Sequence, residues 1–231
     1  MEKNETQNME NRELENIVSE VEKLEVVQAE KGIWQNKFHE FDVYSHTIFF
    51  VNSLKEILGG KIDNDLIVAG LLHDIGKPVV AMPKIKDGVE LKTETGEPYH
   101  EFDDHEKVGE VLVSEMDGEL FDKFGLDKKR IARLVGSHSI PMRGIKEMRK
   151  TLDYDSFRES FFRMKGELQN TGLPVEDIMT MFFADKLAQG KHCTDRGELF
   201  AVRECILQED DLDSALRNVY KIQKDAYGKK E

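Results

Sequence analysis

The chain is poor in cysteine, tryptophan and proline, and it has no long apolar run. Its 231 residues include two cysteines, one tryptophan and five prolines. Cys193 and Cys205 do not form a CxxC-type metal pair, so we expect two ordinary reduced thiols. No apolar stretch approaches the roughly 20 residues that cross a bilayer. Residues 1–5 are polar and acidic and lack a signal-peptide core. We therefore expect a cytoplasmic protein without a membrane partner.

Positive charge is also in short supply, with 33 Lys and Arg residues against 46 Asp and Glu residues, a net charge of −13. Long nucleic acids are held mainly through phosphate neutralisation by basic side chains, so we expect none as a partner. Any phosphate site must be local. Residues 143–150 hold four basic side chains, and we predict that Arg143 and Lys146 contact substrate. A solvated helix face is the alternative for this stretch.

The bulk composition fits a soluble, helix-rich protein with one large domain or one domain with an appendage, since 39% of residues are hydrophobic and 34% are charged. Apolar spacing predicts an amphipathic helix over residues 13–27, within an N-terminal extension of residues 1–30. Residues 1–12 should be frayed. The helix could pack on the main domain, residues 31–225, or on a second subunit in a homodimer.

The most informative stretch is a run that is apolar on all sides, residues 66–72, followed by His73 and Asp74. The run predicts a buried helix, with Gly76 as its C-terminal cap and Pro78 just after it. An imidazole and a carboxylate in an apolar interior need partners, and a divalent metal partners both at once. The alternative is a core histidine bonded to its neighbour's carboxylate.

Other histidines and aspartates fall where they could join this pair. His46 opens a helix that should run antiparallel to the buried one, so that its start lies beside His73. His105 and His138 lie on the apolar faces of two predicted helices, capped by Asp103 or Asp104 and by Asp127. Asp185 continues an apolar stripe and needs a positive partner. The histidines and aspartates that we expect to bind metal are therefore His46, His73, Asp74, His105, His138 and Asp185.

Alternating residues flank an Asp87-Gly88 pair between residues 82 and 93, which predicts a two-residue β-hairpin beside the metal. Such a loop could cover the site and help to select the substrate. Loop decoration without a function is an equal alternative.

The order H…HD…H…H…D, with the HDxGK form at residues 73–77, resembles the HD superfamily of metal-dependent phosphohydrolases over residues 38–190. The resemblance implies an all-α helical bundle. It also implies a first metal held by His46, His73, Asp74 and Asp185, and a second available to His105 and His138 with Asp74 bridging. Residues 38–47 also look like the start of the HD region in bacterial CCA-adding tRNA nucleotidyltransferases. The chain lacks a nucleotidyltransferase domain, so we do not expect tRNA-end synthesis.

The chemistry that this set favours is hydrolysis of a phosphoester or phosphoanhydride in a small nucleotide or related compound. One or two divalent ions would lower the pKa of bound water and supply hydroxide, and the ligands do not distinguish Fe, Mn, Ni, Zn, Co or Mg. We expect Asp74 to orient that water and Lys77 to offer a cation to the phosphoryl oxygens. The rival hypotheses are a di-iron oxygenase and a non-catalytic metal-binding sensor or scaffold. The sequence assigns no role to His39, His100 or His192.

Overall fold

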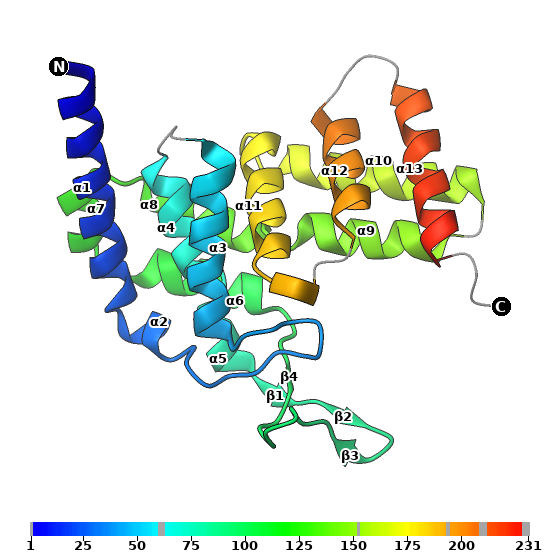
Figure 1. Ribbon diagram of the computed structural model, residues 1–231, viewed down its shortest axis with the longest axis horizontal. Coiled ribbons are helices and arrows are strands. Elements are labelled where there is room, and N and C mark those ends of the chain that lie inside the picture. Colours follow the sequence, from blue (N-terminus) through cyan, green and yellow to red (C-terminus); the bar gives the residue numbers. More distant parts are fainter. Residues whose placement is uncertain (1, 60–62, 152, 193–194, 208–211, 228–231) are drawn as a thin grey trace.

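Helices make up most of the regular structure in the computed structural model, which describes residues 2–59, 63–151, 153–192, 195–207 and 212–227 (Figure 1). The all-α prediction is therefore confirmed. In chain order the helices are α1 (Glu2–Glu22), α2 (Glu25–Gln28), α3 (Val43–Leu58), α4 (Asn64–Leu72), α5 (Lys77–Val80), α6 (His105–Glu115), α7 (Glu119–Phe124), α8 (Lys128–Ser137), α9 (Ile140–Lys150), α10 (Tyr154–Asn170), α11 (Val175–Leu187), the 3-10 turn η1 (Gly190–His192), α12 (Arg196–Leu207) and α13 (Leu212–Tyr227).

The central element is α4, whose residues from Leu66 to Leu72 are all buried. It packs between α3 and α8, while α6 lies along α8 and α11 along α3. Figure 1 shows α1 at one end of the molecule and α12 and α13 at the other, where α9 and α10 cross behind them. Because α3, α4, α6, α8 and α11 meet around one core, their ends can bring polar side chains together.

The N-terminal helix begins at Glu2, so the prediction that residues 1–12 are frayed was wrong for residues 2–12, and Met1 lies outside the described residues. Residues 2–22 contain no glycine or proline, and nothing in them interrupts a helix once it has formed. Leu14, Ile17 and Val21 are buried in the same core as α4, against which α1 packs. The amphipathic face therefore lies on its own chain, and a homodimer stays a prediction.

The predicted hairpin is present and projects away from the helices beside α5 (Figure 1). Strand β2 (Ile85–Lys86) pairs antiparallel with β3 (Val89–Glu90), and β1 (Met82–Pro83) with β4 (His100–Glu101). Asp87 and Gly88 both have positive φ, 53° and 79°. That pair of conformations is the one that a type I′ hairpin turn requires.

Cys205 is a free, buried thiol, as predicted, whereas Cys193 lies outside the described residues. Within the described chain, no helix is both long and apolar enough to cross a bilayer.

Candidate metal centre

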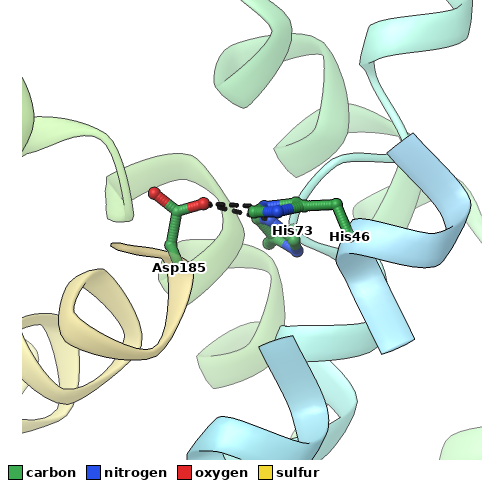
Figure 2. A group of neighbouring side chains, drawn as sticks. All are labelled: His46, His73 and Asp185. Carbon is green, nitrogen blue, oxygen red and sulfur yellow. Dashed lines mark hydrogen bonds and ion pairs between the residues drawn. The ribbon is translucent and has the colours of Figure 1, made fainter. Parts of the chain in front are cut away.

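His46 and Asp185 face each other from two packed helices. The Asp42 carboxylate accepts a hydrogen bond from Ser45 N at 2.9 Å and so caps α3 just before Val43. This places His46 in the first turn, where it is fully buried. Its Nε2 lies 2.8 Å from Asp185 Oδ1 on α11 (Figure 2).

His73 is the first residue beyond α4, which ends at Leu72. Its Nδ1 lies 2.8 Å from the Gly70 carbonyl, and its Nε2 points toward Asp185, 3.9 Å from Oδ1 (Figure 2). A Cβ on Gly70 would lie 2.6 Å from the Phe50 ring, so glycine is needed there for α3 to approach α4. The Phe50 ring stacks on His73 with a centroid distance of 4.4 Å. The close packing of α3 and α4 therefore brings His46 and His73 together.

Gly76 does not cap α4, and Pro78 lies in the first turn of α5, so those two predictions were wrong. The backbone of Gly76 has φ −74°, which any residue can adopt. There is no room for a side chain at Gly76, because a Cβ there would lie 2.1 Å from His105 O and 2.8 Å from Gly109 N. Glycine at this position lets the start of α6 reach the end of α4.

His105 and His138 form a second pair beside Asp74. His105 is the first residue of α6 and His138 directly follows α8, and these two helices pack along each other. The two Nε2 atoms are 3.4 Å apart. From Asp74 Oδ1, they lie at 3.5 Å and 4.0 Å respectively.

The two helix caps expected near these histidines differ in outcome. Asp127 caps α8 as predicted by accepting a hydrogen bond from Arg130 N at 3.0 Å. Asp104 occupies the cap position of α6, but its side chain makes no capping bond. Its carboxylate instead contacts Lys107 Nζ at 2.6 Å, and its φ is 57°. The cap of α6 therefore falls at Asp104, one of the two predicted positions, but without the side-chain hydrogen bond that the prediction implied.

All four histidines use Nδ1 in the same way. In each ring Nδ1 lies within hydrogen-bond distance of a backbone carbonyl, which can only accept, so Nδ1 carries the proton. The pairs are His46 with Ala188 O at 3.3 Å, His73 with Gly70 O at 2.8 Å, His105 with Phe102 O at 2.9 Å and His138 with Val135 O at 2.7 Å. Each Nε2 then offers a lone pair in the tautomer that binds metals.

The electrostatics favour neutral imidazoles at His105 and His138 beside an ionised Asp74 carboxylate. Burial lowers the pKa of His138 to about 4, with nearby His73 and His105 adding to the effect. Burial, followed by the charge of Lys77, also lowers the pKa of His105. Burial alone would raise the pKa of Asp74, but His73 and Lys77 outweigh it and hold that pKa well below its ordinary value.

Asp74 divides its two oxygens between the histidine pairs. Oδ2 lies 3.1 Å from His73 Nε2 and 4.0 Å from His46 Nε2. Oδ1 faces His105 and His138 at the distances given above. One carboxylate therefore stands between two clusters, an arrangement that could bridge two ions.

The residues in both clusters fit a divalent metal. In each cluster the candidate ligand atoms lie within 4.8 Å of one another, and the clusters are His46, His73 and Asp185, and Asp74, His105 and His138. Among the described residues, His73 Nε2 and Asp74 Oδ1 are buried without a hydrogen-bond partner. Leaving such atoms unpaired costs about 1–3 kcal/mol each. Imidazole nitrogens and carboxylate oxygens without thiolates suit first-row divalent ions.

Lys77 is buried beside the two candidate metal clusters, and its ammonium group points toward Asp74. Its Nζ lies 2.6 Å from Asp74 Oδ2 and 2.6 Å from Gln35 Oε1. Only 7% of the residue is exposed. The ammonium group therefore holds the Asp74 carboxylate directly, while its predicted contact with substrate stays a prediction.

Arg143 and Lys146 do not belong to either cluster. Arg143 is half exposed and donates to Glu106 Oε1 at 2.8 Å and to Ser139 Oγ at 2.5 Å. Lys146 is exposed and has no hydrogen bond or ion pair to any residue in the described ranges. Of the two predicted substrate contacts, Lys146 thus has the freer cation.

The three histidines to which the sequence assigns no role are His39, His100 and His192. The His39 ring meets His46 edge-on, with a centroid distance of 5.2 Å. His100 has its Nδ1 3.1 Å from the Trp34 carbonyl. The side chain of His192 lies outside the described part of the structure.

No sequence pattern indicated Gln35, which contacts Lys77, or Glu30, on which the charge of Lys77 acts. Both are buried, and neither Glu30 carboxyl oxygen has a hydrogen-bond partner in the part of the chain that the structure describes. Neither residue falls on a helical stripe, and polar residues in a connecting segment are usually exposed. No signal in the sequence distinguishes them from surface residues.

This fold and site define a helical protein that gathers four histidines and two aspartates in two clusters that could hold metal ions. A sequence model of the HD domain matches residues 43–188, well over half of the chain, and the protein therefore belongs to the HD-domain family. That family consists largely of metal-dependent phosphohydrolases, which indicates a metal-dependent, hydrolase-type function in general terms. No curated protein and no solved structure matches the chain, so no homologue supports the likeness to CCA-adding enzymes.

Proposed function

We propose that the protein is a metal-dependent phosphohydrolase that acts on a small phosphorylated compound, with a nucleotide as the favoured class. The observation that carries this proposal is the division of Asp74 between two clusters of imidazole nitrogens. A site with one bridging carboxylate suits two ions a few ångströms apart, as in many enzymes that hydrolyse phosphoesters. When bound, the ions would supply a deprotonated water as nucleophile and neutralise charge on the phosphoryl group.

The protein's own residues would prepare this site before substrate arrives. The backbone carbonyls hold each Nε2 toward the centre, so the rings need no reorientation when an ion binds. Lys77 fixes one oxygen of Asp74. The surrounding apolar core limits access of water to the buried side of His73 and Asp74. Such preorganisation is the main contribution that a protein makes to phosphoryl transfer.

Lys146 is the residue best suited to bind a substrate phosphate. Burial lowers the pKa of Lys146, and the nearby cations add to the shift in the order Lys186, Arg149, Lys150 and Lys84. These four cations all act on Lys146, although Arg149 is paired with Glu198 and Lys84 with Glu101, in a chain whose net charge is −13. A bound anion would relieve this repulsion, which supports a small anionic substrate. Lys84 belongs to the segment between β1 and β2, and its charge is among those that lower the pKa of Lys146.

The proposal is tested by loading chelator-treated protein with single metals and assaying phosphate release from a panel of nucleotides and phosphoesters. We expect turnover that depends on metal and is lost in Asp74→Ala, which removes oxygens facing both clusters. His100→Ala is the matched control, because that histidine belongs to neither cluster. Oxygen consumption without phosphate release would instead select a di-iron oxygenase. Bound metal without turnover on any substrate would indicate a sensor or scaffold.

A further inference from the structure

Lys77 is held from three sides. Its ammonium group donates to Asp74 Oδ2 and to Gln35 Oε1, both at 2.6 Å, and lies 5.4 Å from the centroid of the Phe102 ring. An ammonium group has three N–H donors, and these contacts account for them. The group is thus a fixed part of the centre, and its position depends on the acceptor on each side.

Gln35 provides the second of these contacts from outside the matched HD segment, residues 43–188. The residue is 2% exposed. Its Nε2 has no hydrogen-bond partner among the described residues, so its Oε1 bond to Lys77 is the polar contact that the structure records for this buried amide. A glutamine that served packing alone would be replaced at no loss by an apolar residue of the same length.

We propose that Gln35 is a positioning residue that acts through Lys77 to orient the Asp74 carboxylate between the two metal clusters. Asp74 must present Oδ2 to His46 and His73 and Oδ1 to His105 and His138, so its carboxylate plane has one useful orientation. The inference rests on the metal centre of the proposed function and does not depend on which reaction that centre performs.

Gln35 is needed for positioning because the side chains of Asp74 and Lys77 can each adopt several conformations. The terminal torsion of an aspartate is broad, and a lysine side chain has several rotamers of similar energy. With Gln35 in place, Lys77 has one position that satisfies both acceptors, and Asp74 Oδ2 is held by it. Without this acceptor, the buried ammonium group either moves or draws Asp74 toward itself. Both changes would misalign the carboxylate and weaken metal binding.

The test measures Mn²⁺ affinity by calorimetry on chelator-treated full-length protein, and it needs no enzymatic assay. Gln35→Met removes the acceptor but keeps the length of the side chain. We expect it to weaken Mn²⁺ binding about tenfold, the smaller end of the effect of losing a residue that supports a metal ligand. Gln35→Glu keeps an acceptor for Lys77. It should bind Mn²⁺ at least as tightly as the wild-type protein. Gln169→Met, at an exposed position on α10, is the control for the substitution itself.

The route through Lys77 is tested by repeating Gln35→Met in a Lys77→Met background. The proposal expects the second substitution to add less than about a twofold loss there, because coupled residues do not act additively. A full tenfold loss in that background would overturn it, as would wild-type Mn²⁺ affinity in Gln35→Met. If wild-type protein binds Mn²⁺ but hydrolyses nothing, the hydrolase proposal fails and this inference stands. Wild-type protein that takes up no metal would overturn both.

Discussion

His105 Nε2 lies 3.4 Å from His138 Nε2, and the Nδ1 of each ring is committed to a backbone carbonyl. In that tautomer both facing nitrogens carry lone pairs, which repel each other across such a distance. Asp74 Oδ1, at 3.5 Å and 4.0 Å, adds a third electron-rich atom. A cation between the three atoms turns this repulsion into attraction, which is the physical argument for an ion in this cluster.

The first prediction follows from that arrangement. His105→Ala and His138→Ala should each reduce the metal content from about two ions toward one per chain, as expected for a two-metal site. The ion held by His46, His73 and Asp185 should remain. Elemental analysis of protein purified without chelator provides the count, with His100→Ala as the control. Wild-type protein that saturates with a single ion, both with and without reductant, would contradict the two-metal arrangement.

The second prediction concerns substrate binding by Lys146. Lys146→Met should raise KM about tenfold or more with little change in metal content, since a hydrogen bond to a charged group contributes about 1.5–3 kcal/mol. Arg143→Gln should have a smaller effect, because that guanidinium is already bound to Glu106. Steady-state kinetics on the best substrate of the panel gives both values. Lys129→Met, at an exposed position on α8, is the matched control. If Lys146→Met leaves the kinetics unchanged, the basic stretch is a solvated helix face.

The third prediction concerns the close approach at Gly76. Gly76→Ala would place a methyl group 2.1 Å from His105 O, so α6 must move. We expect a loss of about 1–3 kcal/mol or more in the free energy of unfolding, the usual cost of overpacking. The second ion should also bind more weakly, because His105 moves with α6. Urea unfolding and metal titration measure the two effects.

A matched control for this substitution exists in α10. A Cβ on Gly166 would meet nothing within 4 Å, so Gly166→Ala should be neutral or should stabilise the helix by up to about 1 kcal/mol. Equal stability of Gly76→Ala and wild type would show that α6 does not depend on this contact.

The sequence predicts those features that a local pattern encodes. The apolar run of residues 66–72 is sufficient to predict a buried helix, and the Asp87-Gly88 pair is sufficient to predict the hairpin turn. The family's motif order also indicated which histidines and aspartates the fold brings together. Features that depend on contacts distant in sequence were not predictable. The need for glycine at residue 76 arises from the position of α6, and the role of Gln35 arises from the position of Lys77.

The last prediction uses Glu30, a fully buried carboxyl group. Burial, and then the charge of Asp74, raise the pKa of Glu30 well above its ordinary value; Asp42 acts in the same direction, while Thr47 and Lys77 oppose the shift. In the unfolded chain a glutamate ionises near about pH 4.3. Between that pH and the raised folded pKa, the folded state binds more protons than the unfolded state, so stability decreases as pH rises.

Glu30→Gln removes this titration and keeps the shape of the neutral acid. In the presence of chelator, the melting temperature of Glu30→Gln relative to that of wild type should therefore be higher at about pH 8 than at about pH 5. Most of the expected ionisation of Glu30 falls between these two pH values. Glu25→Gln, at an exposed position on α2, should change the melting temperature little at either pH. A Glu30→Gln difference that is the same at both pH values would mean that the Glu30 carboxyl group is not held as the neutral acid. The buried carboxyl group would then need a cationic partner, and Lys77, whose charge lowers the pKa of Glu30, is the candidate.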